Sequence, residues 1–285
     1  MIYLDYHATT PVDPAVLEAM LPYFCEKFGN AASRGHRYGW DAEAAVEKAR
    51  EQVAKLINAS PAEIIWTSGA TESDNLAIMG VCDLYAEKGN HVITQATEHP
   101  AVLDTCAHWE RKGGKVTILP TDSYGQIAID QLKNAITDRT ILISIMHANN
   151  EIGTLQPSAE IGRIAKEYGV LFHTDAAQSA GKVTIDVMSM NIDLLSLSAH
   201  KLYGPKGIGA LYVRRKNPRV QLQPLIHGGG QERGMRSGTL AVPNIVGLGK
   251  ACEIATQVMH QEASRIATLR EKLFQDLVAE VGDVV

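Results

Sequence analysis

The sequence predicts an α/β fold in which helices cover both sides of a mostly parallel sheet. Short apolar runs of strand length alternate with longer segments whose apolar residues recur at helical spacing. Most of these runs are continuously hydrophobic, as in parallel strands that are buried on both faces. They lie at residues 91–94, 115–119, 140–146, 170–173 and 194–197, and a further strand is predicted at 63–66.

Helices are predicted between several of these strands and near both ends of the chain. The helical segments are 15–28, 75–79, 101–111, 158–167 and 243–278. The last of them carries an apolar stripe formed by Ile254, Met259, Ile266, Leu269, Leu273 and Leu277. Residues 204–213 contain a GxxGxG spacing, which we interpret as a tight glycine turn into an antiparallel strand rather than as a phosphate loop.

Composition narrows the class of protein. The 285 residues are 45% hydrophobic, which is enough to bury a large core. The net charge of -5, without a basic run, argues against a nucleic-acid-binding protein. No apolar stretch reaches the roughly 18 residues of a membrane helix, and the N-terminus lacks a signal-peptide pattern. We therefore expect a cytoplasmic protein.

The cysteine spacing suggests neither a metal site nor a disulfide framework. The four cysteines are Cys25, Cys82, Cys106 and Cys252. They are far apart and form no CxxC pair, which zinc sites and redox motifs usually contain. We expect them to be reduced and structural.

A lysine and an aspartate each follow a predicted buried strand. Lys201 comes after the strand at 194–197, and Asp175 comes after the strand at 170–173. A lysine amine can form a Schiff base with pyridoxal phosphate, while a carboxylate can keep the pyridine nitrogen protonated. Taken singly, such a lysine is usually a solvated loop residue, and such an aspartate is often a helix cap. Together they suggest pyridoxal phosphate, which also requires a phosphate site.

Residues 67–75 (TSGATESDN) have the features of a phosphate site. The segment lies between the strand at 63–66 and a helix, and its small residues let the backbone approach an anion. The N–H groups and the positive dipole end of the helix favour a phosphate, with the Thr71 hydroxyl as a further donor. The alternative is a capping box without a ligand, with Thr71 as N-cap and Asp74 as its partner.

Polar residues follow the ends of several predicted strands, where open α/β sheets bind ligands. They lie at 67–68, 98–99, 149–150, 175 and 200–201. His99 suits proton exchange because its usual pKa is about 6.5, although before Pro100 it could also be a turn residue that caps a helix. Asn149 and Asn150 could likewise form only a turn. The shared position after strand ends supports one common site.

Taken together, these segments resemble the aminotransferase class V branch of the fold-type I pyridoxal-phosphate enzymes. Within that branch they resemble the cysteine desulfurases of the NifS and IscS type, over nearly the whole chain. The matching motifs are YLDYHATTP at 3–11, SGATESDN at 68–75, EH at 98–99, NNEIG at 149–153, DAAQ at 175–178, SAHK at 198–201 and RSGT at 236–239. The resemblance implies a three-layer fold of the pyridoxal-phosphate-dependent transferase type, with a smaller C-terminal domain.

The resemblance also implies roles for residues around the cofactor ring. Lys201 would form the Schiff base and move a proton between the substrate α-carbon and the cofactor. Asp175 would pair with the pyridine nitrogen, and Gln178 would hydrogen-bond the phenolic oxygen. His99 would stack on the ring and act as an acid or base, and Asn150 would contact the side of the substrate carboxylate.

The phosphate of the cofactor would be held at the other end of the site. By the same resemblance, its contacts would come from Ala70, Thr71, Ser198 and His200. Thr239 would reach the phosphate bound by a neighbouring subunit, which implies a homodimer.

The implied activity is conversion of L-cysteine to L-alanine, with the sulfur passed as a persulfide to an acceptor or scaffold protein. The acceptor would serve iron-sulfur cluster assembly or tRNA thiolation. The alternatives are a selenocysteine lyase, another class V aminotransferase or a non-catalytic sulfur-pathway fragment. An unrelated NAD-binding protein is disfavoured, because no GxGxxG opens a helix after the first strand.

The domain organisation expected from the family is only partly contained in this chain. Residues 1–14 would associate with the small domain, 15–245 would form the cofactor domain, and 246–285 would be the long helix that opens a small domain, incomplete here. The sulfur-accepting cysteine of the family matches none of the cysteines present. We therefore expect that cysteine beyond residue 285, in a longer enzyme.

Overall fold

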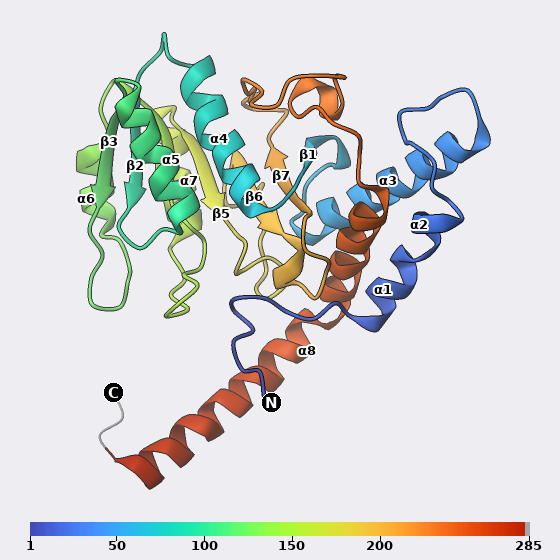
Figure 1. Ribbon diagram of the computed structural model, residues 1–285. Coiled ribbons are helices and arrows are strands. Elements are labelled where there is room, and N and C mark those ends of the chain that lie inside the picture. The colour runs from blue at the N-terminus through green and yellow to red at the C-terminus, as the bar shows by residue number, and fades with distance from the viewer. Residues whose placement is uncertain (283–285) are drawn as a thin grey trace.

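The computed structural model describes residues 1–282, which form a seven-stranded sheet with helices on both sides (Figure 1). The strand order is β1-β7-β6-β5-β4-β2-β3. The strands are β1 (Ile64–Thr67), β2 (His91–Gln95), β3 (Lys115–Leu119), β4 (Thr140–Ser144), β5 (Leu171–Asp175), β6 (Leu194–Ser198) and β7 (Gly209–Val213). The run from β3 to β6 is parallel, whereas β7 is antiparallel to both β6 and β1. The mostly parallel sheet and the antiparallel strand after the glycine turn are thus confirmed.

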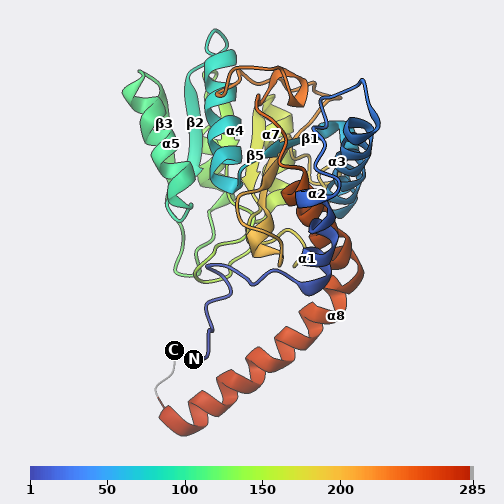
Figure 2. The same cartoon turned by 45° about the vertical axis from the view of Figure 1, so that its right-hand side comes forward.

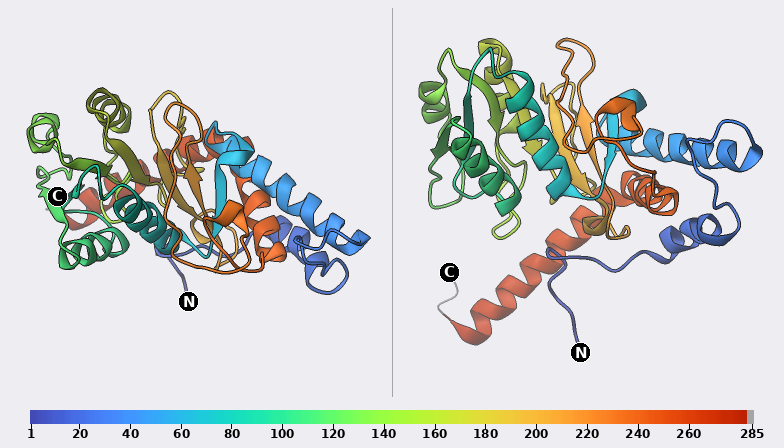
Figure 3. Two further views of the ribbon diagram at one scale, coloured as in Figure 1. Left: turned by 90° about the horizontal axis from the view of Figure 1, so that it is seen from above. Right: turned by 45° about the horizontal axis from the view of Figure 1, so that its top comes forward.

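Two layers of helices enclose the sheet (Figures 2 and 3). The helices are α1 (Pro14–Met20), α2 (Pro22–Cys25), α3 (Arg37–Leu56), α4 (Ala70–Leu84), α5 (Pro100–Arg111), α6 (Ile129–Ala135), α7 (Ser158–Tyr168) and α8 (Val242–Val281). The first layer consists of α4 and α5. The second contains α3, α6, α7 and the first part of α8. This arrangement is the expected three-layer fold.

Helix α3 was not among the predicted helices, although its pattern contains the necessary signal. Its buried residues Ala42, Val46, Ala49 and Val53 recur at intervals of three and four, as one face of a helix requires. The segment predicted at 15–28 instead forms two short helices, α1 and α2.

The prediction that β3 is buried on both faces is wrong. Lys115 and Ile118 are exposed, whereas every residue of β2, β4 and β6 is buried. The reason is position, because β3 is an edge strand that pairs only with β2. An apolar run by itself does not distinguish an edge strand from a central one.

The long helix α8 changes environment along its length. Up to Ala255 it packs against the hydrophobic core, and its C-terminal part extends away from the sheet layers (Figure 1). The predicted apolar stripe is consequently exposed at its end, where Leu269 and Leu273 are 53% and 60% accessible. Among residues 1–282, no helix is both long and apolar enough to cross a membrane.

The two faces of the sheet differ in polarity. The face that meets α3, α7 and α8 carries mainly apolar side chains, including Ile93, Ile143, Phe172, Leu195 and Tyr212. On the face toward α4, apolar residues occupy the amino-terminal part of the parallel strands. Nearer the carboxyl ends, the same face carries Ser144, His173, Asp175 and Ser196. This polar part of the layer lies directly behind the site.

Candidate active site

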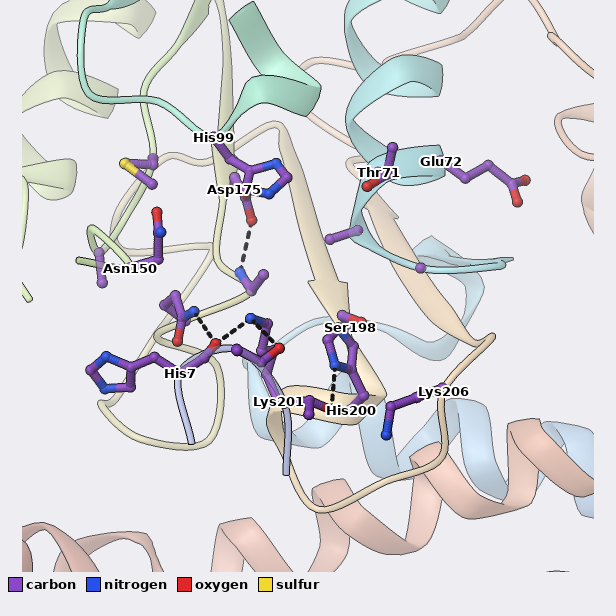
Figure 4. A pocket seen from close by; sticks show the side chains of 18 of the residues that line it. His7, Thr71, Glu72, His99, Asn150, Asp175, Ser198, His200, Lys201 and Lys206 are labelled. Carbon is purple, nitrogen blue, oxygen red and sulfur yellow. Dashed lines mark hydrogen bonds between the residues drawn. The ribbon is translucent and has the colours of Figure 1, made fainter. Parts of the chain in front are cut away.

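A cavity of about 960 Å³ opens at the carboxyl ends of the parallel strands (Figure 4). Nearly all of the predicted site residues line it: Ala70, Thr71, His99, Asn150, Asp175, Gln178, Ser198, His200 and Lys201. Thr239 is exposed and does not line this cavity. Its predicted contact is with a neighbouring subunit, so that assignment stays a prediction.

One end of the cavity is formed by the N-terminus of α4. The helix begins at Ala70 after Gly69 at the N-cap, and no side chain caps it. The alternative in which Thr71 is the N-cap of a capping box is therefore wrong, because Thr71 lies inside the first turn. The N–H groups of that turn have no acceptors within the helix and can bind an anion.

Close packing of two glycines brings this loop against the sheet. A Cβ atom built on Gly209, the first residue of β7, would lie 2.5 Å from the carbonyl oxygen of Leu197 and 2.7 Å from the Cα of Gly69. A larger residue at position 209 would displace the loop, which supports the structural interpretation of the glycine turn.

The carboxylate of Glu72 lies near this end but is neutralised by Arg236. Arg236 Nε donates to Glu72 Oε1 at 2.8 Å, and the Ser68 N–H donates to Oε2 at 2.8 Å. Burial of Glu72 opposes ionisation, but these hydrogen bonds outweigh it and lower the pKa of the carboxyl. The negative charge is thus held by Arg236 instead of facing a bound anion alone.

Asp175 ends β5 with its carboxyl group at the cavity. The Ala177 N–H donates to Oδ1 at 2.8 Å. Burial raises the pKa of Asp175, and the Ala177 N–H, His99 and Lys201 offset this rise only in part. A protonated pyridine nitrogen would supply the cation that this buried carboxylate needs.

His99 caps a helix and also lines the cavity. It is the N-cap of α5, where its Nδ1 accepts a hydrogen bond from the Ala101 N–H at 3.1 Å, and its ring also lines the cavity. Because Nδ1 accepts, the neutral ring carries its proton on Nε2. The cap therefore fixes the ring and leaves Nε2 for proton exchange.

Lys201 follows β6 in a short 3-10 helix (Ala199–Lys201), and its amine is held by the N-terminal segment. Nζ donates to the carbonyl oxygen of Ala8 at 3.0 Å and also to that of His7. Burial lowers the pKa of Lys201, and the carboxylates of Asp175 and Asp5 oppose this in part. A lowered pKa favours the neutral, nucleophilic amine.

No role in the site was predicted for the N-terminal segment. His7, Ala8 and Thr9 line the cavity, and Gln178 Nε2 also donates to the His7 carbonyl oxygen, at 2.9 Å. The motif at 3–11 was the only signal, since backbone carbonyl contacts do not depend on the type of side chain.

Asn149 forms a turn, whereas Asn150 lines the cavity. Asn149 forms the turn, with its Oδ1 accepting from the N–H groups of Glu151 and Ile152 at 2.9 and 3.0 Å. Asn150 lines the cavity. The turn thus presents the second asparagine to the site.

The cysteines take no part in the cavity. Cys82, Cys106 and Cys252 are buried, and burial raises the pKa of Cys106 and of Cys252 to about 12. Cys25 is exposed on α2 and does not line the cavity either. In the part of the chain that the structure describes, no group of three or more His, Cys, Asp or Glu residues could hold a metal ion.

The residues present fit pyridoxal phosphate. A helix N-terminus with hydroxyl and imidazole donors, an amine of lowered pKa and a buried carboxylate without a cationic partner surround one space (Figure 4). These groups match the phosphate, the aldehyde and the pyridine nitrogen of the cofactor, respectively.

Comparison with known proteins identifies the relatives of this chain. The aminotransferase class-V family matches residues 2–284. The cysteine desulfurase IscS of Rickettsia rickettsii (strain Iowa) is 58% identical over 283 residues, which cover 99% of this chain and 69% of that protein. The cysteine desulfurase IscS of Anaeromyxobacter dehalogenans (strain 2CP-C) is 60% identical over 280 residues, which cover 98% and 69%.

Solved structures agree with these relatives. A NifS-like protein superposes with a TM-score of 0.94 at 44% identity, covering 98% of this chain and 76% of the other. A structure described as SspA in complex with cysteine has a TM-score of 0.85 at 50% identity, covering 89% and 72%.

Proposed function

Because the chain belongs to the aminotransferase class-V family, we propose that it is a pyridoxal-phosphate-dependent cysteine desulfurase. The observation that carries this proposal is the single cavity in which Lys201, Asp175 and His99 meet the N-terminus of α4. Relatives at 58% and 60% identity are named cysteine desulfurase IscS, and one similar structure is described as a complex with cysteine.

The residues that would hold the cofactor are distributed over both ends of the cavity. The N–H groups of Ala70 and Thr71, with the side chains of Ser198 and His200, would hold its phosphate, and Asp175 would hold its ring nitrogen. When bound, pyridoxal phosphate supplies an electron sink for the carbanion that forms at the substrate α-carbon.

Lys201 and His99 would perform the proton transfers. The Lys201 amine, once released from the carbonyl oxygens of His7 and Ala8, can take a proton from the substrate α-carbon and return it. His99 Nε2 can exchange a proton with the substrate sulfur or amine, while the helix cap keeps its ring in place.

Asn150 and Gln178 would orient the reactants. In our assignment Asn150 contacts the substrate carboxylate. Gln178 would bind the phenolic oxygen of the cofactor through Nε2, which here donates to the carbonyl oxygen of His7. This exchange couples cofactor binding to the position of the N-terminal segment.

The remaining assignments belong to the complete reaction. We infer that sulfur leaves as a persulfide on a cysteine outside residues 1–285, since the cysteines of this chain are away from the cavity.

We further propose a cytoplasmic homodimer in which Thr239 reaches the partner's phosphate site, and a sulfur acceptor that serves iron-sulfur assembly or tRNA thiolation. Residues 1–14 and 246–285 are proposed to belong with a small domain and 15–245 with the cofactor domain.

Borohydride trapping tests the cofactor assignment directly. Reduction of the purified yellow protein, followed by peptide mapping, should place the cofactor adduct on Lys201, and Lys201→Ala should lose it. Lys206→Ala is the matched control, because Lys206 also lines the cavity. An adduct on Lys206 or any other lysine in the unmodified protein would refute the assignment.

Product analysis tests the substrate. With reductant and the complete enzyme, L-cysteine should yield alanine and sulfide in equal amounts. Turnover of selenocysteine without turnover of cysteine would reassign the protein as a selenocysteine lyase.

A further inference from the structure

A carboxyl group lies buried and unpaired in the layer behind the cavity. Asp74 on α4 is 0% exposed, and neither of its carboxyl oxygens has a hydrogen-bond partner among the described residues. The nearest group that could carry a positive charge is His173 on β5, whose Nε2 lies 3.6 Å from Asp74 Oδ1. An ionised carboxylate in such a place would be strongly destabilised, so the carboxyl should be neutral.

His173 is also satisfied as a neutral ring. Its Nδ1 lies 2.8 Å from the Ser144 hydroxyl, and its Nε2 lies 3.0 Å from the Ser196 hydroxyl. Because hydroxyls can donate or accept, either neutral tautomer is accommodated. Burial lowers the pKa of His173 to about 3, so the ring does not offer Asp74 a cation near neutral pH.

The ionisable neighbours of Asp74 besides His173 are two carboxyl groups, those of Asp175 and Glu98. Burial raises the pKa of Asp74 well above its usual range, Asp175 and Glu98 raise it further, and the Ser196 hydroxyl opposes this only in part. Glu98 precedes α5 and is itself buried. Its Oε1 accepts from the Met146 N–H at 2.5 Å, and its Oε2 has no hydrogen-bond partner within the described residues 1–282. Burial likewise raises the pKa of Glu98.

We propose that Asp74 stays protonated behind Asp175 while His173 stays neutral, so that Asp175 alone presents a negative charge to the pyridine nitrogen. An ionised Asp74 would repel the Asp175 carboxylate and favour a proton on it. Asp175 could then no longer pair as an anion with a protonated ring. Asp74 is thus a positioning residue for the proposed desulfurase, and the inference rests on that function.

Infrared spectroscopy tests the protonation of Asp74 without any turnover. The difference spectrum between wild type and Asp74→Asn at neutral pH should contain the carbonyl stretch of a protonated carboxyl group, lost in the variant. Asp83→Asn is the matched control, because Asp83 is an exposed carboxylate on the same helix, paired with Lys112 at 2.6 Å. A difference spectrum with only ionised-carboxylate bands overturns the proposal.

The pH dependence of unfolding also tests whether folded Asp74 carries a proton. If folded Asp74 is protonated while the unfolded residue is ionised, the wild-type folded state holds one extra proton, and its stability falls as the pH rises. The ratio of the unfolding constants of wild type and Asp74→Asn should then rise about tenfold per pH unit between about pH 5.5 and 7.5. A ratio that does not change with pH overturns the proposal.

The protonation of the pyridine nitrogen tests how Asp74 and Asp175 act on the cofactor. With ¹⁵N-labelled pyridoxal phosphate, Asp74→Asn should keep the protonated-nitrogen signal of wild type, whereas Asp175→Asn should lose it. Loss of the signal in Asp74→Asn would mean that a charge on Asp74 is needed, against the proposal. If the protein bound no pyridoxal phosphate, the proposed function would fail, yet the infrared and unfolding measurements would still decide the state of Asp74.

Discussion

Two buried ionic clusters of this molecule differ in how completely their polar atoms are paired. In the first, Arg50 on α3 meets Glu232 in a bidentate pair, with both N–O distances 2.9 Å. Arg50 Nη1 also donates to the carbonyl oxygen of Ile64 at 2.7 Å, and Glu232 Oε2 accepts from the Trp66 N–H at 2.8 Å. The guanidinium lies 5.2 Å from the Trp66 ring centre.

The second cluster lies across the sheet and is incomplete. Asp74, Glu98 and Asp175 are buried there without a lysine or arginine in contact, and oxygens of Asp74 and Glu98 lack hydrogen-bond partners within residues 1–282. Burial leaves the Arg50 pair fully satisfied, whereas it leaves the carboxyl cluster needing a proton or a cation. The paired Arg50 cluster therefore suits a structural role, whereas the unpaired carboxyl cluster suits the binding of a cationic group.

The largest effect is expected for Arg50→Met, which should lower the free energy of unfolding by about 3–5 kcal/mol, because Glu232 is left buried and unpaired. Urea denaturation with saturating pyridoxal phosphate measures it. Arg37→Met on the same helix is the control, since Arg37 and Asp41 form an exposed pair at 3.6 Å. Similar losses of stability in both variants would show that the buried Arg50 pair contributes no more to stability than an exposed pair.

Asp175→Asn should leave the fold intact and lower the turnover number by roughly 10²–10³-fold, as expected when a preorganised charge is lost from a reacting centre. Alanine formation by the complete enzyme measures the turnover, and some bound cofactor should remain. Asp104→Asn, at an exposed position on α5, provides the control. Unchanged turnover in Asp175→Asn would show that the carboxylate has no role at the ring nitrogen.

His173→Gln should change how stability depends on pH. The pKa of His173 is lowered to about 3 by burial, so below about pH 6.5 the unfolded chain binds a proton that the folded chain does not. The free energy of unfolding therefore decreases as the pH falls, by about 1.4 kcal/mol per pH unit between about pH 6 and 4.

Glutamine does not titrate, so the difference between wild type and His173→Gln in urea titrations should carry this slope. The same substitution at His108, an exposed histidine on α5, is the matched control. Parallel pH profiles for wild type and His173→Gln would indicate that His173 is charged in the folded protein.

The smallest effect is expected for Arg236→Met, which exposes the Glu72 carboxylate to the phosphate end of the cavity. The pair is only partly buried, with side-chain accessibilities of 21% and 16%, so the affinity for pyridoxal phosphate should fall by about 1 kcal/mol, roughly fivefold. Fluorescence titration measures the affinity, and the loss should shrink at high salt. Tighter binding in the variant would contradict the assigned role of Arg236.

Much of the site was predictable because its residues follow strand ends. Lys201, Asp175 and His99 lie within a few residues of the ends of apolar runs, and parallel strands carry their carboxyl ends to one edge of the sheet. The edge position of β3 was not predictable, because burial depends on neighbouring strands that the run itself does not specify.

Periodicity and motif order are local properties of the chain, so they were enough to predict the mostly parallel sheet, the family and the cavity residues near strand ends, but not the N-terminal part of the cavity. Tertiary packing brings the carbonyl oxygens of His7 and Ala8 to Lys201 and buries Asp74 against His173. These contacts join residues that are about one hundred or more positions apart in the chain. Their burial and partners arise only when helices and strands pack together, and it is burial that raises the pKa of Asp74 and lowers the pKa of Lys201.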